Sequence, residues 1–347
     1  MLRAASEGAR GGVPCYSPRV GEPPSSSLSD DGDSPPSAGE RAWTPLRRWT
    51  YAAKPASWPK LLVPFLLGQG IGAAAAEGFS LLGFAFGLGF TVLDTLYVVF
   101  LNDWSDELVD AIKRRRFPHG CSPKTIPDGI LPARALLRAG LACGVLAFGS
   151  AVAVSVLKGS WVAAGLGGLG LLVFAAYSLP PLRLNYRGGG ELLEFVGVGV
   201  LLPWFSAYLQ AGELWMPQLV VVPGFAMLAG ASAVASGLSD EQSDREGGKR
   251  TFTTELGNPG ARRLVEALVL GGAIVWVATS HFLPRMLPPW VSAVALVVLL
   301  VEFRSMHQLS ARAGTNMFHG QKRYKAHLHR AIWGAGAAMA LLLPWVR

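Results

Sequence analysis

Long apolar runs alternate with short polar breaks from Trp58 to the end of the chain. Many of the short breaks carry Pro or Gly, as at Pro180-Pro181 and Pro288-Pro289, where helices commonly end. Runs of 17 to 25 residues are long enough to cross the apolar core of a bilayer as helices. The pattern therefore predicts an all-α polytopic membrane bundle of nine transmembrane helices, at residues 59–77, 80–101, 132–156, 161–178, 191–209, 217–237, 264–282, 287–303 and 327–345.

Composition supports this class. Of the 347 residues, 51% are hydrophobic and only 16% are charged, and many of the 42 glycines lie inside apolar runs, which membrane helices tolerate. Residues 1–40 are different: they are rich in Ser, Pro, Gly and Asp and contain almost no aliphatic run, so we expect a disordered tail before a membrane domain at residues 41–347. The tail lacks the apolar centre of a signal peptide, and its six acidic residues argue against a transit peptide.

The distribution of basic residues predicts the orientation. With the N-terminus in the cytoplasm, 28 of the 31 Lys and Arg residues fall on the cytoplasmic side, and only Lys158, Arg285 and Arg347 fall on the other. This asymmetry follows the positive-inside rule for a multi-pass protein, here expected in a bacterial inner membrane. The net charge of +8 is thus mainly a matter of topology, and nucleic acid is not an expected partner.

Two acidic clusters mark the cytoplasmic ends of the second and sixth predicted helices. Asn102, Asp106 and Asp110 recur every four residues, and so do Asp240 and Asp244, which in helical geometry places each set along one stripe. An acidic run at a helix end is usually a solvated face. Two clusters with matched spacing on one membrane face instead favour a site for Mg²⁺ ions that bridge to the oxygens of a diphosphate.

The same residues carry a resemblance to a known family. The chain from about Lys54 onward resembles the UbiA superfamily of intramembrane prenyltransferases, because its clusters match the two Asp-rich motifs of that family in order and spacing: Asn102-Asp103-x-x-Asp106-x-x-x-Asp110 and Asp240-x-x-x-Asp244-Arg245-x-x-Gly248-Lys249-Arg250-Thr251. The resemblance implies a nine-helix bundle. It also implies transfer of a polyprenyl chain from its diphosphate to an acceptor, commonly an aromatic ring.

This chemistry assigns roles to residues on the donor side. Loss of diphosphate from an allylic carbon builds negative charge, which Mg²⁺ and nearby Lys or Arg residues stabilise. The expected metal ligands are Asp106, Asp110, Asp240 and Asp244, with Asn102 as a neutral oxygen donor and Asp103 as a further contributor. The expected diphosphate-binding residues are Lys124, Lys249, Arg250, Lys54 and Arg245. The run from Lys113 to Arg116 is interpreted as a topology anchor.

The acceptor side is less sharply defined. Tyr177 stands where many family members carry a Tyr followed four residues later by Lys, but here that later position is Pro181 and the nearest cation is Arg183. Tyr177 and Arg183 are the candidate catalytic residues there, beside Asp106 and Asp240. Tyr177 also suits an interfacial aromatic position. The segment after Tyr177 is closer to chlorophyll synthase-like relatives, whereas the ending at Lys249 looks more like dihydroxynaphthoate prenyltransferases.

We therefore expect a Mg²⁺-dependent polyprenyltransferase that alkylates an aromatic acceptor in menaquinone- or ubiquinone-type quinone biosynthesis. Other acceptors stay open: a chlorophyllide-like tetrapyrrole, haem, or a glycerol phosphate lipid. A cation transporter is the rival from another class, because intramembrane carboxylates also mark ion paths. That rival predicts acidic residues near helix midpoints, and Asp94 alone fits it; we expect Asp94 to face the bundle rather than lipid.

Overall fold

The fold comes from a computed structural model that describes residues 43–76, 78–119, 121 and 124–346. The predicted disordered tail, residues 1–40, lies outside the described residues. The described chain is helical, with one isolated backbone bridge between Arg187 and Arg250. The fold class predicted from the apolar pattern, an all-helical membrane bundle, is confirmed.

Long helices make up most of the bundle. They are α2 (Pro59–Ala75), α3 (Leu81–Ser105), α5 (Ala133–Lys158), α6 (Val162–Ser178), α9 (Val222–Ser236), α11 (Phe252–Phe282), α12 (Pro289–Leu309) and α13 (Phe318–Leu342). A further long element is composite: α7 (Gly190–Val196) continues through a π-helical segment, η3 (Gly197–Leu201), into α8 (Leu202–Ala211).

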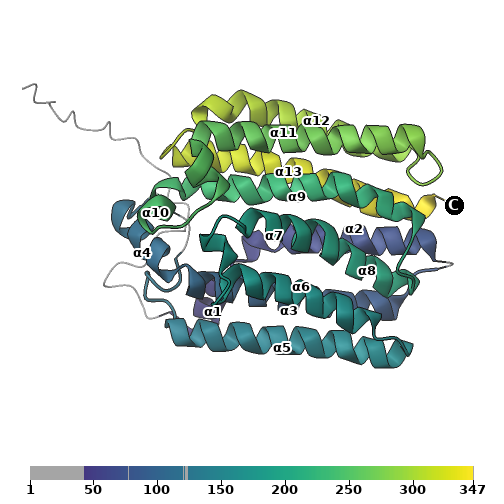
Figure 1. Ribbon diagram of the computed structural model, residues 1–347, viewed down its shortest axis with the longest axis horizontal. Coiled ribbons are helices and arrows are strands. Elements are labelled where there is room, and N and C mark those ends of the chain that lie inside the picture. Colours follow the sequence, from purple (N-terminus) through teal and green to yellow (C-terminus); the bar gives the residue numbers. More distant parts are fainter. Residues whose placement is uncertain (1–42, 77, 120, 122–123, 347) are drawn as a thin grey trace, which may run out of the picture. The chain divides into compact units, whose positions relative to one another are not determined.

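Short elements connect them. Three are α-helices: α1 (Pro45–Ala53), α4 (Glu107–Arg116) and α10 (Glu241–Glu246). The others are 3-10 turns: η1 (Pro55–Ser57), η2 (Leu184–Tyr186), η4 (Pro217–Val221), η5 (Gly237–Ser239), η6 (Ser310–Arg312) and η7 (Leu343–Trp345). Figure 1 shows the long helices side by side, with α4 and α10 together beyond the ends of α3 and α9.

Each predicted membrane span overlaps a helical segment of the structure. Among the described residues, six segments are long and apolar enough to cross a membrane, at Leu81–Ser105, Ala133–Lys158, Gly190–Ala211, Pro217–Ser239, Phe252–Phe282 and Pro289–Arg312. Helix α6 is apolar but shorter. The chain is thus an integral multi-pass membrane protein, while the number of nine crossings stays a prediction.

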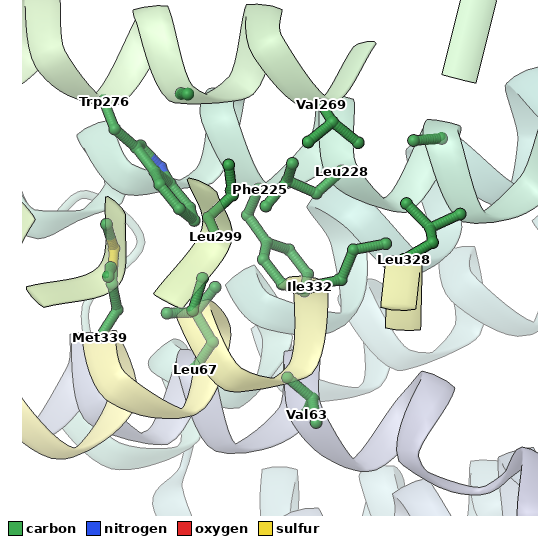
Figure 2. Close-up of a cluster of buried hydrophobic side chains, with 14 of the residues drawn as sticks. Val63, Leu67, Phe225, Leu228, Val269, Trp276, Leu299, Leu328, Ile332 and Met339 are labelled. Atoms are coloured by element: carbon green, nitrogen blue, oxygen red, sulfur yellow. The ribbon is translucent and has the colours of Figure 1, made fainter. Parts of the chain in front are cut away.

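The largest core lies where α2, α9, α11, α12 and α13 meet. Trp276 of α11 is fully buried there against Phe225 and Leu228 of α9, and its indole Nε1 donates a hydrogen bond to the carbonyl of Val221 at 2.9 Å. Figure 2 shows these side chains interleaved with Met339 of α13. Because the indole N–H is satisfied, the large ring is buried without an unpaired polar group.

Helices α2 and α8 approach each other more closely than ordinary side chains allow. A Cβ atom added at Gly68 would lie 2.6 Å from Ser206 Cβ, and one added at Gly72 would lie 2.6 Å from Gln210 Cβ. Two glycines four residues apart create a flat strip on α2 that lets the two backbones pack directly, as in other membrane helix pairs. This contact fixes α8, which forms part of the wall of the cavity described below.

We expect Gly72→Ala to lower the free energy of unfolding by about 1–3 kcal/mol, because the added methyl group overpacks the α2–α8 contact. Gly149→Ala is the matched control, since nothing lies within 4 Å of a Cβ added there. The control should change stability by about 1 kcal/mol or less, in the stabilising direction, because Ala favours helix over Gly. Unfolding of the purified protein in detergent measures both, and equal effects of the two substitutions would contradict the close contact.

Candidate active site

Both acidic motifs straddle a break between two helices. Helix α3 ends at Ser105 and α4 begins at Glu107, so Asp106 is the residue between them, with φ −95° and ψ 10°. Asp240 lies in the same way between η5 and α10, with φ −111° and ψ −3°. The backbone amide of Asp110 still bonds the carbonyl of Asp106 at 2.8 Å. The predicted i, i+4 spacing therefore holds on both sides of Asp106, although the residues of the first motif lie on two helices, α3 and α4, rather than on one.

The two short helices that follow these breaks, α4 and α10, pack together. Gly247, at the end of α10, lies against Val109 of α4 so closely that a Cβ atom there would overlap the Val109 side chain. This contact brings the second half of each motif to the same place. We call this end of the bundle, which carries Asp103, Asp106, Asp110, Asp240 and Asp244, the carboxylate end.

Four of these carboxylates form ion pairs with lysines from other elements. Asp103 pairs with Lys54, which follows α1, and Asp240 pairs with Lys113 of α4. Asp110 pairs with Lys124 of the loop between α4 and α5, and Asp106 pairs with Lys249 at 2.8 Å. Most of these side chains are buried, although the Asp240 side chain is about one third exposed. The carboxylate end is therefore a set of alternating buried charges.

Neutral side chains complete this set. The Thr125 hydroxyl donates to Asp103 at 2.5 Å, and the Asn185 amide donates to Asp106 at 3.3 Å. Asn185 is 1% exposed, and its Oδ1 atom has no hydrogen-bond partner among the described residues. An unpaired oxygen beside Asp106 is a position where a cation would be stabilised.

Asp128 explains how Lys124 is held. Its carboxylate accepts a hydrogen bond from the Lys124 backbone amide at 3.1 Å and one from the Tyr51 hydroxyl at 2.9 Å. It also forms an ion pair with Arg114, with 2.6 Å between Arg114 Nε and Asp128 Oδ1. The loop is thus fixed to α1 and α4, so the Lys124 side chain faces Asp110 with little freedom.

Lys249 is held from the other side of the site. Its backbone amide bonds the Asp244 carbonyl at 2.7 Å, and the next amide, of Arg250, bonds the Tyr186 carbonyl at 3.2 Å. The Glu191 carboxylate of α7 accepts the Phe252 amide at 2.8 Å at the start of α11. These bonds attach the end of the second motif to η2 and α7, and they aim the Lys249 ammonium at Asp106.

The structure does not bring every predicted residue into this cluster. Arg250 is exposed and pairs with Glu255 at 2.8 Å, and Arg245 is exposed and donates to the Thr254 carbonyl at 2.9 Å. Arg183 donates to the Ser105 carbonyl and lies 3.7 Å from the centre of the Tyr186 ring. Arg183 thus contacts the end of α3 and is not among the residues that line the cavity described below.

Lys113, by contrast, belongs to the carboxylate end although the sequence did not assign it to the site. The run from Lys113 to Arg116 was expected to be a topology anchor, yet the Lys113 side chain is only 2% exposed and pairs with Asp240. Its ammonium also lies 5.9 Å from the centre of the Phe318 ring. The reason is that α4 packs against α10 after the helix break at Asp106, so the side of α4 that carries Val109, Ile112 and Lys113 is buried rather than exposed to solvent.

Burial and neighbouring charges shift the pKa values here. Burial alone would lower the pKa of Lys124, but Asp110 and Asp240 raise it above its usual value. Burial alone would raise the pKa of Asp240, but Lys113 and Lys124 hold it below its usual range. Asp244 differs: burial, opposed by Lys249 but reinforced by Asp240 and Asp106, raises its pKa to about 8.

The residues present fit a divalent cation bound together with a diphosphate. Asp244 is 4% exposed, and its carboxylate forms no hydrogen bond or ion pair within the described ranges, so nearby Lys249 compensates its ionised form only in part. Hard oxygen donors of this kind suit Mg²⁺, which binds through one or two carboxylates plus phosphate oxygens. Within the part of the chain that the structure describes, no three acidic, His or Cys side chains are already arranged as metal ligands. The predicted ligand set stays a prediction.

A cavity of about 280 Å³ opens beside the carboxylate end. Its polar lining near that end includes Lys54, Asn102 and Asp103, and Tyr177 also lines it. Most of the remaining wall is apolar and comes from α3, α6, η3 and α8, with Phe90, Phe174 and Phe205 among its side chains. Asp94 lines the cavity as well, so it faces the bundle as expected. The site therefore combines a charged end with an adjoining apolar chamber.

Several residues of this arrangement were not singled out by the sequence. Asn185, Tyr186 and Thr125 contact the motif residues from outside the motifs, and no spacing rule marks them. Lys60 and Glu194 are charged residues inside predicted membrane helices, and this unusual placement is the feature of the sequence that could have marked them as candidates. The Tyr186 hydroxyl donates to the Ser105 carbonyl at 3.2 Å, next to the break at Asp106.

Comparisons with known proteins agree with this picture. The family model described as the UbiA prenyltransferase family matches residues 61–326. The 1,4-dihydroxy-2-naphthoate octaprenyltransferase of Bacillus subtilis is 26% identical over 183 residues, which cover 52% of this chain and 54% of that protein. The protein of the same name from Mycobacterium leprae is 26% identical over 308 residues, which cover 85% of this chain and 96% of that protein.

A solved structure shares the fold. A UbiA homologue from Archaeoglobus fulgidus, solved with DMAPP and Mg²⁺ bound, superposes with a TM-score of 0.62 at 15% identity. The match covers 84% of this chain and 99% of that one. At this identity the likeness shows the shared fold alone. The chain spans only about half the length of the Bacillus subtilis relative, so activity and substrates must be argued from the site itself.

The raised pKa of Asp244 predicts how the metal-free protein responds to pH. A carboxyl group whose folded pKa is about 8 takes up protons on folding between about pH 4 and pH 8, so stability is present at low pH and declines as pH rises through that window. In the presence of a chelator, Asp244→Asn should therefore be about as stable as the wild type at pH 4, and it should become progressively more stable than the wild type as the pH rises to 9. Thermal unfolding in detergent measures this. Glu246→Gln, at an exposed position, is the control, and an Asn variant less stable than wild type at pH 9 would contradict the prediction.

Proposed function

The chain belongs to the UbiA prenyltransferase family, and on that premise we propose that it transfers a polyprenyl group from its diphosphate to a hydroxylated aromatic acceptor in a Mg²⁺-dependent reaction. The product is a precursor of a membrane quinone. The observation that carries this proposal is the juxtaposition of alternating buried carboxylates and lysines with an apolar chamber. A prenyl diphosphate has the same two parts, a charged head and an apolar chain.

The lysines of the carboxylate end are suited to the diphosphate head. Lys124, Lys249, Lys113 and Lys54 each face a carboxylate in the structure. Phosphate oxygens can take the place of those carboxylates as lysine partners, because both are compact anions that accept charged hydrogen bonds. The carboxylates released in this exchange, Asp103, Asp106, Asp110 and Asp240, would then hold Mg²⁺ together with Asn102 and Asp244.

Bound Mg²⁺ would supply charge neutralisation for the departing diphosphate. The protein's own lysines contribute in the same direction, since they are fixed in place before the reaction and need not reorganise as negative charge develops. Lys124 and Lys249 are the best placed of these cations, because each is anchored through its backbone and buried beside a motif carboxylate. Arg250 and Arg245, which point outward, are not part of this proposal.

The reaction exchanges one bond for another. The bond between C1 of the prenyl group and the diphosphate oxygen breaks, and its electron pair leaves with the diphosphate. A carbon of the acceptor ring donates an electron pair to form the new bond to C1, and the ring then loses a proton to water to restore its aromaticity. Phe174, which stacks on Tyr177, would keep water from the allylic carbon and so favour transfer over hydrolysis, whereas Phe90 and Phe205 line the deeper part of the chamber.

The size of the chamber favours a small acceptor. A volume of about 280 Å³ is at the small end for ligand sites. One or two fused aromatic rings with the first units of a prenyl chain suit it better than a tetrapyrrole macrocycle does. A hydroxylated naphthoic acid fits this size, and relatives named as 1,4-dihydroxy-2-naphthoate octaprenyltransferases support the choice.

The transporter alternative is less well supported. It requires acidic residues spaced through the depth of the bundle, whereas the motif carboxylates lie together at the helix ends. Asp94 is the exception, and a single acidic residue is not sufficient to form an ion pathway across the bundle. We further propose that the carboxylate end faces the cytoplasm of a bacterial inner membrane, because the basic residues concentrate at that end of the predicted topology.

Turnover by the purified protein tests this function. The protein is incubated with Mg²⁺, geranylgeranyl diphosphate and 1,4-dihydroxy-2-naphthoate, and the products are identified by mass. Wild type should form a prenylated product that a chelator abolishes and Mg²⁺ restores. Asp106→Asn and Asp240→Asn should each lower kcat/KM by about 1000-fold, because stabilisation worth several kcal/mol is lost at the leaving group.

Glu213→Gln is the matched control, because Glu213 is exposed outside the carboxylate end and should leave turnover unchanged. Full activity in either Asp variant would contradict the proposed donor site. Cation flux in vesicles without any prenylated product, across acceptors that include a tetrapyrrole and a glycerol phosphate, would contradict the proposed function.

A further inference from the structure

A second charged group lies in the wall of the cavity, apart from the ion pairs of the two motifs. Lys60 of α2 and Glu194 of α7 form an ion pair, with 2.5 Å between Lys60 Nζ and Glu194 Oε1. Lys60 also donates a hydrogen bond to the Ser236 hydroxyl of α9 at 3.3 Å. All three residues line the cavity. Three helices distant in sequence thus bring one charged pair to the chamber.

A contribution to the stability of the fold does not readily explain why this ion pair is buried here. Both side chains are largely buried, with 25% of Lys60 and 16% of Glu194 exposed. Removing two charges from water is costly, and apolar residues of similar size would often serve a helix contact as well or better. The Glu194 Oε1 atom, moreover, is buried and accepts no hydrogen bond among the described residues, where the ion pair with Lys60 is its one charged contact. A carboxylate with an available oxygen in a cavity is suited to bind a hydrogen-bond donor.

The position of the pair relates it to the acceptor. Tyr177, which also lines the cavity, lies close enough to Asp106, Lys249 and Glu194 to interact electrostatically with each. Glu194 is therefore near the charged end, where the reactive C1 atom of a prenyl diphosphate would lie. The ion pair with Lys60 offsets part of the cost of burying the Glu194 carboxylate in this apolar wall.

The other polar candidates in the chamber fit the acceptor less well. Arg183 is engaged with Ser105 and Tyr186 outside the cavity lining. Asp94 lies two turns deeper than Asn102 on α3, a separation of about 12 Å at 1.5 Å per residue. An acceptor ring bonded to C1 would not reach Asp94, which faces the region available to the prenyl chain.

We propose that Glu194, oriented by Lys60, accepts a hydrogen bond from a ring hydroxyl of the aromatic acceptor. This inference rests on the proposed prenyl transfer and specifies its acceptor as a phenol or hydroxynaphthoate. A hydrogen bond from the hydroxyl to a carboxylate increases electron density in the ring, so the ring carbon attacks C1 more readily. Glu194 is then the residue that selects hydroxylated rings, and Lys60 is a positioning residue.

The test compares acceptors that differ by one hydroxyl. Wild type and Glu194→Gln are assayed with 1,4-dihydroxy-2-naphthoate and with two analogues that lack one hydroxyl each, 1-hydroxy-2-naphthoate and 4-hydroxy-2-naphthoate. For each protein, discrimination is the kcat/KM for the parent acceptor divided by the kcat/KM for an analogue. For one of the two analogues, this ratio should be about 10- to 100-fold larger in wild type than in Glu194→Gln, as expected for a hydrogen bond to a charged group. The comparison cancels the intrinsic reactivity of each ring.

The donor side should not respond. Glu194→Gln should leave the KM for geranylgeranyl diphosphate and the Mg²⁺ requirement unchanged. A general loss of structure would alter both. Lys60→Met keeps the carboxylate but removes its partner, and it should weaken the same discrimination by a smaller factor. Lys322→Met, at an exposed position on α13, is its matched control. Unfolding midpoints in detergent identify any variant that fails to fold, and Lys60→Met then carries the test.

Each outcome bears on one claim. If wild type yields no product with any acceptor, the proposed function fails. If wild type is active but Glu194→Gln and Lys60→Met retain its full discrimination between acceptors, the role of Glu194 is overturned. Loss of discrimination in Asp94→Asn instead would also overturn it, because the acceptor hydroxyl would then lie at the deeper carboxyl group.

Discussion

The fold and the candidate site both depend on the pairing of buried carboxylates with lysines at one end of the bundle. A buried charge without a partner costs several kcal/mol, so each carboxylate needs a cation close by. Here the partners come from separate parts of the chain: the start of the bundle, α4, the loop before α5 and the segment before α11. The same network therefore closes the bundle at this end and concentrates the groups that suit a metal and a diphosphate.

This network also divides the site into two halves. The motif carboxylates and their lysines are suited to exchange partners when a diphosphate and a divalent cation arrive together, since the total charge is then rebalanced rather than exposed. The pair formed by Lys60 and Glu194 stands apart from that exchange, on the cavity wall. Tyr177 lines the same cavity and interacts electrostatically with Lys249 and Asp106 of the first half and with Glu194 of the second. A polar acceptor can thus be held beside an apolar chain without disturbing the donor site.

Part of this arrangement was predictable from the sequence and part was not. Apolar runs are long and strongly patterned, so the helices appear close to the predicted ranges, and the motif spacing correctly brought Asp106 and Asp240 to the same end. The break at Asp106 was not predictable, because it depends on α4 packing against α10 beside Gly247. That turn buries Lys113, which resembled a surface anchor. Arg250 and Arg245 follow the motif in sequence but point outward, since local partners at Glu255 and Thr254 hold them.

The central claim is that lysines and carboxylates at the carboxylate end form one site for a diphosphate and a divalent cation. Calorimetric titration of the protein with a non-reactive prenyl thiodiphosphate, with and without Mg²⁺, tests it most directly. If the two ligands share the site, each should raise the affinity for the other by the same factor, and Lys124→Met should weaken binding of the diphosphate. Equal affinity for the thiodiphosphate with and without Mg²⁺ would contradict the account.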